Sequence, residues 1–280
     1  MLKGGILLLK EKLQNYKKKC NISIYAFNNK GIVFKYNEDR IQDGACVLKV
    51  FIMLEYIRQV EEGMITGKEL LEVTSNNFAT GAGTVKFLSE GMRIAADDLI
   101  DLMISISDHM AANILIDFLG MEHINETIEM FDFNHTKLLK KYLVPNEYYI
   151  GETTAYEYAM FYKKLDNNEF FSVSCCNYMK EKLAAQKYKD FLAEPLLEKE
   201  DFVMLQSKTG KMDGRTFEIP VNSCVNDGGI CVTVVGNYYI AFLAEIFFDS
   251  EVQMEDIKEL MHEISNDIFE RVLSNEDYIC

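Results

Sequence analysis

The stretch Gly44-Ala45-Cys46-Val47-Leu48-Lys49 decides how this 280-residue sequence is interpreted, because a loop runs into a predicted helix there. A residue at the start of a helix and another three positions later share one face, one turn apart. The free amides at a helix N-terminus and a nearby ammonium favour a thiolate, which makes Cys46 and Lys49 a candidate nucleophile and base. On its own, such a pair is more often a buried thiol beside a surface lysine.

Two further segments carry polar side chains at the ends of predicted elements. Residues 107–109 (Ser-Asp-His) lie between two predicted helices, and residues 208–210 (Lys-Thr-Gly) follow a predicted strand. Taken singly, the first is typical of a helix N-cap, and the second of a strand end with a solvated lysine and a turn glycine. Together with the first stretch they form an ordered set of three motifs, at intervals of about sixty and one hundred residues.

This set resembles the active-site motifs of the β-lactamase-like (penicillin-recognising) superfamily and is nearest to its class A branch. The resemblance continues outside the motifs and covers residues 5–272, nearly the whole chain. The further matching stretches are 36–39 (Tyr-Asn-Glu-Asp), 81–84 (Gly-Ala-Gly-Thr), 111–115 (Ala-Ala-Asn-Ile-Leu), 153–155 (Thr-Thr-Ala) and 227–230 (Asp-Gly-Gly-Ile).

The resemblance implies a catalytic role for each motif. Cys46 stands where the family has its serine nucleophile, and Lys49 stands where the family has the partner base. Ser107 would relay a proton toward the leaving nitrogen, and Lys208 would lie close enough to lower the pKa of that serine. The intermediate that this machinery implies is a covalent acyl-enzyme, here a thioester.

The same resemblance implies how a substrate is held. Thr209 would bind a substrate carboxylate, with Gly210 and Lys211 as further substrate-binding residues. The backbone amides of Cys46 and Lys211 would form the oxyanion hole, which usually supplies a large part of the catalytic gain. Asp108 is expected to be structural and to bond backbone amides of its own turn.

Two departures from the family pattern change the chemistry at the nucleophile. A thiol ionises near pH 8.5, so Cys46 needs less help from Lys49 than a serine hydroxyl would. An engineered serine-to-cysteine replacement would give the same sequence, and that alternative stays open. His109 replaces an asparagine that binds a substrate carbonyl in the family. It could do the same as a donor, act as an extra base beside the thiol, or merely fill the asparagine's space.

A third departure concerns the step that releases the acyl group. The family glutamate that activates deacylating water is missing, because residues 137–141 (Lys-Leu-Leu-Lys-Lys) offer no carboxylate. The nearest acids, Asp132, Glu147 and Glu152, stand at the wrong offsets from the Thr-Thr pair that follows this segment. Efficient lactam turnover in the class A manner is therefore not expected.

The order of predicted elements indicates an α+β fold of the β-lactamase/transpeptidase type. We expect an antiparallel sheet flanked by the two terminal helices, with an inserted all-helical lobe and the site in the cleft between them. Residues 1–42 and 200–280 would form the sheet lobe, and residues 43–199 the helical lobe, as one cooperative unit. The predicted strands are 22–27, 32–36, 202–207, 216–224, 230–235 and 238–247, and the predicted terminal helices are 5–19 and one with Ser250 as its N-cap.

Composition excludes several kinds of partner. With 29 basic and 44 acidic side chains, the net charge of −15 disfavours nucleic acid and anionic lipid. No apolar run is long enough for a membrane helix, and the run 4–9 is too short for a signal core. The seven cysteines lack zinc spacing and the four histidines form no ligand pattern. We therefore expect free thiols, a cytoplasmic protein, and neither a metal nor a cofactor.

The leading hypothesis is a cysteine-dependent acyl hydrolase or acyltransferase that acts on a small-molecule or peptide-like amide, lactam or ester. Either water or an amine could resolve the thioester. The alternatives are a conventional class A β-lactamase and a non-catalytic ligand-binding or sensor protein on the same fold. A D,D-peptidase suits a cytoplasmic protein less well, and a glutaminase-type amidase suits the Ser-Asp-X and Lys-Thr-Gly motifs less well. The acyl substrate and the oligomeric state stay open.

Overall fold

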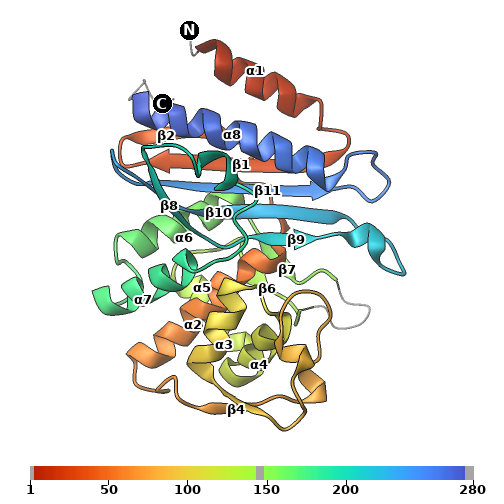
Figure 1. Ribbon diagram of the computed structural model, residues 1–280, viewed down its shortest axis with the longest axis vertical. Coiled ribbons are helices and arrows are strands. Elements are labelled where there is room, and N and C mark those ends of the chain that lie inside the picture. Colours follow the sequence, from red (N-terminus) through yellow and green to blue (C-terminus); the bar gives the residue numbers. More distant parts are fainter. Residues whose placement is uncertain (1–2, 143–147, 275–280) are drawn as a thin grey trace.

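The computed structural model describes residues 3–142 and 148–274. Its main sheet is antiparallel with the strand order β2-β1-β11-β10-β8, and β9 pairs with the part of β10 that β8 leaves free (Figure 1). The α+β class expected from the sequence is confirmed. The strands of this sheet are β1 (Cys20–Asn28), β2 (Gly31–Tyr36), β8 (Phe202–Ser207), β9 (Gly210–Met212), β10 (Ser223–Thr233) and β11 (Tyr238–Ile246).

The central strand β10 corrects the sequence prediction. Strands predicted at 216–224 and 230–235 are replaced by the single strand β10, and residues 214–216 form a 3₁₀ turn. The prediction was wrong because Gly228 and Gly229 look like an interruption. Both lie inside the ladder, where a Cβ on Gly228 would lie 2.6 Å from the Tyr158 ring and one on Gly229 would lie 2.5 Å from the Gln206 carbonyl. These glycines therefore permit close packing rather than a turn.

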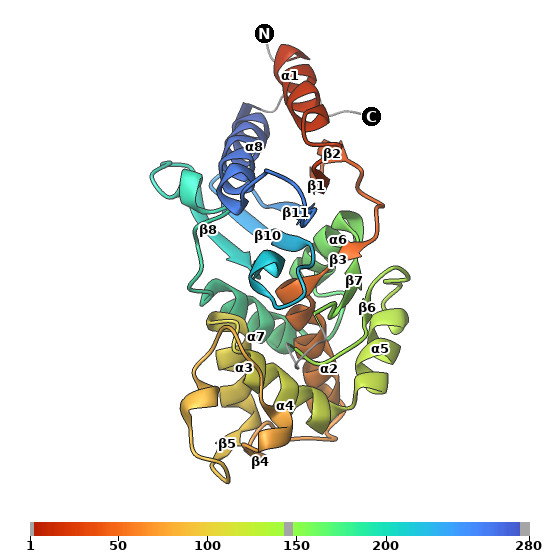
Figure 2. The ribbon, with the colours of Figure 1, turned by 90° about the vertical axis from the view of Figure 1, so that its right-hand side faces the viewer.

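The two terminal helices, α1 (Lys3–Gln14) and α8 (Met254–Ser274), lie on the same side of the sheet (Figures 1 and 2). Leu13 of α1 and Ile264 of α8 are buried in one hydrophobic core with Ile24 of β1 and Phe242 of β11. This arrangement is the one expected from the apolar spacing of the C-terminal helix.

The boundaries of the terminal helices differ from the prediction. The first helix ends at Gln14 instead of residue 19, because the chain continues in turns before β1. Ser250 is not the N-cap of α8, since its hydroxyl accepts a hydrogen bond from the Val252 amide. The helix begins at Met254, and the carboxylate of Asp256 accepts a hydrogen bond from the Gln253 amide at its start.

The opposite face of the sheet is covered by α6 (Ala155–Asp166), which contacts β1, β10 and β11. Below α6, the other helices pack around α2 (Figure 2). Most side chains of α2 are buried. Because α6 belongs to the segment 43–199, helices from that segment pack on the sheet as well as on one another; the lobe boundaries stay a prediction. The other helices are α2 (Lys49–Glu61), α3 (Ala96–Ser105), α4 (His109–Leu119), α5 (Met121–Met130) and α7 (Val173–Ala184).

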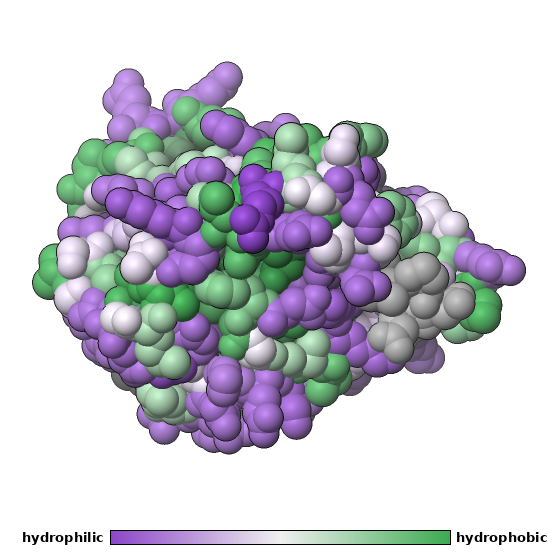
Figure 3. All heavy atoms as spheres, turned by 90° about the horizontal axis from the view of Figure 1, so that it is seen from below, coloured by the Kyte–Doolittle hydropathy of each residue, from purple (hydrophilic) through white to green (hydrophobic). Residues whose placement is uncertain are grey.

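Two small sheets complete the fold. Strands β3 (Gln42–Asp43), β7 (Gly151–Thr153) and β6 (Lys137–Leu138) form one, and β4 (Leu70–Glu72) and β5 (Arg93–Ala95) form the other. The first of these sheets leads directly into the segment that carries Cys46, since β3 ends at Asp43, three residues before Cys46. The end of the molecule that carries β4 has hydrophobic and polar side chains interspersed over its surface (Figure 3). Over the part of the chain that the structure describes, no helix is both long and apolar enough to span a bilayer.

Candidate active site

Cys46 lies in the 3₁₀ turn Ala45–Leu48, between β3 and α2. Ala45 has a φ of +44°, a left-handed conformation that non-glycine residues seldom adopt. The carboxyl group of Asp43 accepts a hydrogen bond from the Ala45 amide at 2.8 Å and so supports this conformation. The strained turn places the Cys46 side chain, which is 6% exposed, against a cavity.

Lys49 is completely buried at the first residue of α2, one turn after Cys46. Its Nζ lies 3.4 Å from Cys46 Sγ, 3.1 Å from Ser107 Oγ and 2.8 Å from the Ser107 carbonyl oxygen. Burial lowers the pKa of Lys49, and the neighbouring Cys46 sulfur opposes that shift in part. The pair proposed from the sequence is thus in contact, and its lysine is not a surface residue.

Lys208 reaches the same serine from the sheet. Its Nζ lies 3.0 Å from Ser107 Oγ and 2.7 Å from the Thr209 carbonyl oxygen, and its side chain is fully buried. Burial, reinforced by the nearby Lys49 ammonium, lowers the pKa of Lys208 to about 7. Because the Ser107 oxygen accepts from both ammonium groups, its own hydrogen is free to point into the cavity that Ser107 lines.

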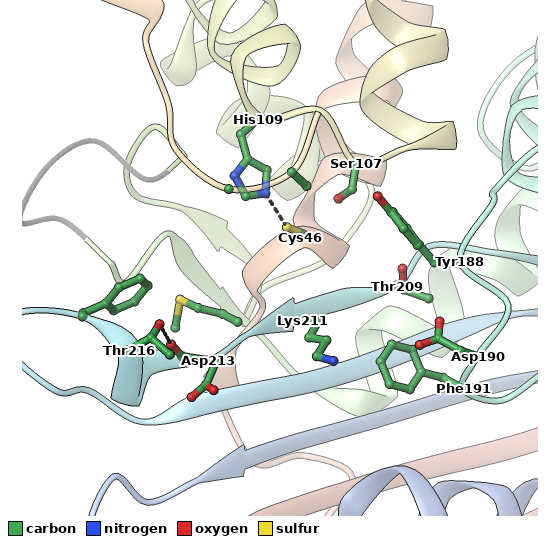
Figure 4. Close-up of a pocket in the computed structure, with 14 residues that line it drawn as sticks. Cys46, Ser107, His109, Tyr188, Asp190, Phe191, Thr209, Lys211, Asp213 and Thr216 are labelled. Atoms are coloured by element: carbon green, nitrogen blue, oxygen red, sulfur yellow. Dashed lines mark hydrogen bonds between the residues drawn. The ribbon is translucent and has the colours of Figure 1, made fainter. Parts of the chain in front are cut away.

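His109 opens helix α4 and faces the thiol. Its Nε2 lies 3.3 Å from Cys46 Sγ, and its Nδ1 lies 2.8 Å from the Thr80 carbonyl oxygen (Figure 4). A carbonyl only accepts, so Nδ1 carries a hydrogen, and Nε2 of the neutral ring must be the acceptor. His109 can therefore take the thiol proton and, once protonated, donate a hydrogen bond back to the thiolate.

The electrostatics around Cys46 favour the thiolate. Burial alone would raise the pKa of the thiol, but the Lys49 ammonium, His109 and Lys208 together outweigh it and hold the pKa of Cys46 well below its ordinary value. These cationic and hydrogen-bonding neighbours come from α2, α4 and the loop after β8. A low thiol pKa of this origin is characteristic of reactive rather than inert cysteines.

Asp108 caps the helix that carries His109. One carboxylate oxygen accepts from the Ala111 amide at 2.9 Å, and the other accepts from the amides of Thr84 and Val85 at 2.5 and 2.9 Å. The loop comes close enough because Gly83 has a φ of +109°, and a Cβ there would lie 2.2 Å from the Asp108 carboxyl carbon. The contacts of Asp108 are therefore to backbone amides, partly of its own turn and partly of the 84–85 segment.

The Lys-Thr-Gly segment forms the opposite wall of the cavity. Thr209 and Lys211 both line the cavity, and the Lys211 side chain is exposed (Figure 4). Gly210 passes so close to the nucleophile that a Cβ there would lie 3.1 Å from the Cys46 amide nitrogen and 3.2 Å from the Val47 amide nitrogen. Strand β9 thus runs directly beside the Cys46 amide, as an oxyanion hole shared by Cys46 and Lys211 requires.

The cavity has a volume of about 330 Å³ and is bounded by both halves of the molecule. Sequence reasoning missed several of its walls, because these residues stand outside the three motifs. The missed residues include Tyr188, Asp190 and Phe191 on one side, and Met212, Asp213, Thr216 and Phe217 on the other. Tyr148 stacks on Phe217 with ring centroids 4.0 Å apart and so supports that side chain.

An aromatic ring, that of Tyr142, lies beside the Lys49 ammonium. Tyr142 is fully buried, its hydroxyl lies 3.4 Å from the Ala45 carbonyl oxygen, and the Lys49 ammonium lies 4.3 Å from the ring centroid. Asn113 holds the Tyr142 backbone in place through its side-chain oxygen and nitrogen, at 2.7 and 3.1 Å. Tyr142 directly follows the 137–141 segment but carries no motif of its own, so sequence reasoning passed over it.

The acids considered from the sequence have other partners. Asp132 is largely exposed and lies 3.7 Å from Lys164, and Glu152 accepts a hydrogen bond from the Tyr149 hydroxyl at 3.2 Å. Glu147 lies outside the described residues. Within residues 3–142 and 148–274, no three His, Cys, Asp or Glu side chains are grouped as metal ligands would be.

The arrangement of the site agrees with the result of a family comparison. A model described as the beta-lactamase enzyme family matches residues 8–272, nearly the whole chain. The chain belongs to the beta-lactamase enzyme family. The membership expected from the three motifs is therefore confirmed, whereas a comparison with curated proteins finds no match to this chain.

Solved structures of beta-lactamases and of a penicillin-binding protein share this fold at low sequence identity. A beta-lactamase from Sphaerobacter thermophilus DSM 20745 has 22% identity and a TM-score of 0.83, covering 98% of this chain and 99% of its own. A class A beta-lactamase from Bacteroides cellulosilyticus DSM 14838 has 20% identity and a TM-score of 0.78, covering 96% and 98%. A point mutant of PBP-A, described as an acyl-enzyme complex with penicillin G, has 19% identity and a TM-score of 0.83, covering 98% and 97%.

Proposed function

We propose that the chain is a cysteine-dependent acyl hydrolase or acyltransferase, in which Cys46 forms a thioester with an amide, lactam or ester substrate. One observation carries the proposal: Cys46 Sγ lies 3.3 Å from His109 Nε2 and 3.4 Å from Lys49 Nζ beside an open cavity. A thiolate held between a base and an ammonium is activated before any substrate arrives. The cavity suits a small-molecule or peptide-like acyl donor.

In the proposed acylation, the Cys46 thiolate attacks the substrate carbonyl carbon, and His109 holds the proton that the thiol has lost. The amides of Cys46 and Lys211 stabilise the oxyanion that forms. Ser107 gives its hydroxyl proton to the leaving nitrogen or oxygen as that bond breaks, and Lys208 returns a proton to Ser107. His109 gains one proton and Lys208 loses one, so the step balances and leaves a thioester on Cys46.

Tyr142 supports a long-lived thioester. It occupies the space beside Lys49 with a ring that cannot act as a carboxylate base toward water. An amine is a stronger nucleophile than water toward a thioester, so the site favours acyl transfer unless the substrate itself brings water to the carbonyl. The thioester is then resolved by an amine acceptor or by slow hydrolysis.

Mass spectrometry of the intact protein after incubation with a reactive penicillin or a nitrophenyl ester tests the proposal. We expect one acyl adduct, located on Cys46 by peptide mapping and lost in Cys46→Ala. Cys175→Ala is the matched control, because Cys175 is a partly exposed free thiol remote from the cavity. An adduct that persists in Cys46→Ala, or no adduct with any donor, would overturn the proposal.

A conventional class A beta-lactamase is the second candidate, favoured by the family match over residues 8–272. Rapid turnover of nitrocefin that is lost in Cys46→Ala would select this candidate over a slow thioester. Reversible ligand binding that survives Cys46→Ala, without turnover of any acyl donor, would instead select a non-catalytic sensor on the same fold.

A further inference from the structure

Lys208 lies at a break in the edge of the main sheet. Strand β8 ends at Ser207 and β9 begins at Gly210, and each pairs with a different part of β10. The Lys208 amide still donates a hydrogen bond to the Gly228 carbonyl at 3.2 Å. The carbonyl oxygen of Lys208, in contrast, accepts a hydrogen bond from a side chain of helix α6. The peptide group that carries a central cation of the site is therefore held partly by side chains rather than by a strand ladder.

Two tyrosine hydroxyls of α6 close a ring of hydrogen bonds around Lys208. Tyr158 Oη lies 2.5 Å from the Lys208 carbonyl oxygen, and Tyr162 Oη lies 3.1 Å from the backbone amide nitrogen of Lys208. The two hydroxyl oxygens are 2.7 Å apart. A carbonyl only accepts and an amide only donates, so the direction of the ring is determined. The Lys208 amide donates to Tyr162, Tyr162 donates to Tyr158, and Tyr158 donates to the Lys208 carbonyl.

The contacts of these two side chains with Lys208 depend on their hydroxyl groups. Tyr158 and Tyr162 are four residues apart on one face of α6, completely buried, with ring centroids 5.1 Å apart. Burying a hydroxyl is unfavourable unless it is hydrogen-bonded, so phenylalanine would suit a purely apolar contact better. The glycine at position 228 makes room for the Tyr158 ring. Neither tyrosine is among the residues that line the cavity, so neither would touch a substrate.

We propose that Tyr158 and Tyr162 are positioning residues that fix the Lys208 peptide, so that its ammonium stays within reach of Ser107. The inference rests on the proposed function, in which Lys208 returns a proton to Ser107. The ammonium lies 3.0 Å from Ser107 Oγ, and a small backbone displacement would break this contact. Loss of either hydroxyl leaves a buried group of the Lys208 peptide with a weakened or missing partner.

The inference has a signature in the pH dependence of acylation. The ammonium form of Lys208 is the donor, so acylation should fall as the pH rises through the pKa of Lys208, about 7. A displaced ammonium is less buried, which moves its pKa, and with it the falling limb of the pH profile, to higher pH. The groups around it that carry charge or titrate are Lys49 of α2, Cys46 of the 3₁₀ turn, Asp227 of β10, and Tyr158 and Tyr162 of α6.

The experiment compares Tyr158→Phe and Tyr162→Phe with wild type and with Tyr239→Phe. Tyr239 is the matched control, since it is also a buried tyrosine whose hydroxyl contacts α6. That hydroxyl donates a hydrogen bond to the Asp166 carboxylate at 3.0 Å. Acylation of Cys46 by a nitrophenyl ester is followed by mass spectrometry across pH, and the Lys208 ammonium is titrated by NMR. We expect acylation to slow by about tenfold in each of the two variants, with the falling limb and the titration of Lys208 moved to higher pH.

The control variant should keep the wild-type rate, limb and titration. An unchanged Lys208 titration in both folded variants overturns the inference, whether or not wild type is acylated. A slower rate with an unmoved limb also overturns it, because that result indicates only a structural role. Absence of a wild-type adduct overturns the proposed function, and the NMR titration then still decides whether the tyrosines position Lys208. Should one variant fail to fold, the other carries the comparison.

Discussion

The charge of the Lys49 ammonium is the largest single interaction that lowers the pKa of the Cys46 thiol against the effect of burial. Lys49→Met retains the volume of the buried chain and removes the charge, so the pKa of Cys46 should rise. We expect alkylation of Cys46 by iodoacetamide to slow several-fold at pH 7 and to recover at higher pH. Lys164→Met is the control, because Lys164 bonds the Phe131 carbonyl far from the thiol, and its profile should match wild type.

If Lys49→Met alkylates with the wild-type pH profile, the thiolate does not depend on the buried ammonium. Measurement of the profile for Cys46 alone requires peptide mapping, since five other free cysteines lie in the described part of the chain.

The buried ring of Tyr142 fills the space beside the Lys49 ammonium. Tyr142→Ser should leave acylation intact and shorten the lifetime of the thioester by about tenfold, less than the 10²–10⁴ of a positioned general base. The decay of the adduct mass after removal of excess ester measures this lifetime. Tyr142→Phe, which keeps the ring and loses only the long 3.4 Å contact to Ala45, should decay like wild type. A thioester lifetime in Tyr142→Ser equal to that of wild type would show that the ring does not exclude water.

The main candidate positions of the site could be found from the sequence because each stands in a recognisable motif. Cys46, Lys49, Ser107 and Lys208 could be connected through spacing and family resemblance, and the structure brings them into contact. Tyr142 could not be found in this way. Its position depends on a long-range bond network through Asn113, which no local pattern records.

At the scale of elements, strand β10 joins the edge of the sheet that borders the cavity to the centre of the sheet. Gly229→Ala would place a Cβ 2.5 Å from the Gln206 carbonyl oxygen and 2.9 Å from the Ser207 side chain, so β8 would have to move. We expect a loss of about 1–3 kcal/mol in the free energy of unfolding, measured by urea denaturation, and slower acylation because Ser207 precedes Lys208. If Gly229→Ala kept the stability and the acylation rate of wild type, the added methyl group would fit between the strands without displacing β8.

The elements that sequence could predict are those with strong local signals. Strands β1, β2, β8 and β11 agree with the predicted ranges within about two residues, because apolar runs and turn residues mark them. Strand β10 was predicted as two separate strands, 216–224 and 230–235, because two glycines inside a strand look like a turn. Their reason is tertiary: a neighbouring strand and the Tyr158 ring leave no space for side chains.

For the whole molecule, the buried carboxyl groups predict how stability depends on pH. Burial raises the pKa of Asp43 to about 7, above its value in an unfolded chain, although the Ala45 amide opposes the shift. The folded state therefore binds more protons than the unfolded state between about pH 4 and pH 7, and stability falls as the pH rises through this range. Asp43→Asn, which keeps an oxygen for the Ala45 amide, should make that fall smaller.

Urea denaturation of wild type and Asp43→Asn at several pH values measures the difference. The slope should differ by at most about 1.4 kcal/mol per pH unit, the contribution of one titrating group. Burial also raises the pKa of Asp227 to about 7, so Asp227 should cause part of the loss of stability with rising pH in both proteins. Parallel curves for the two proteins would contradict a buried, titrating Asp43.

The contrast among the thiols has a consequence for the life of the protein. Burial raises the pKa of Cys20, Cys224 and Cys231, whereas the pKa of Cys46, which lines an open cavity, is held below its ordinary value. Peroxides react with thiolates, so oxidative damage should begin at Cys46, first as a sulfenic acid that small thiols can reverse. The arrangement that lowers the pKa of this thiol should therefore also expose the protein to inactivation wherever reducing agents are scarce.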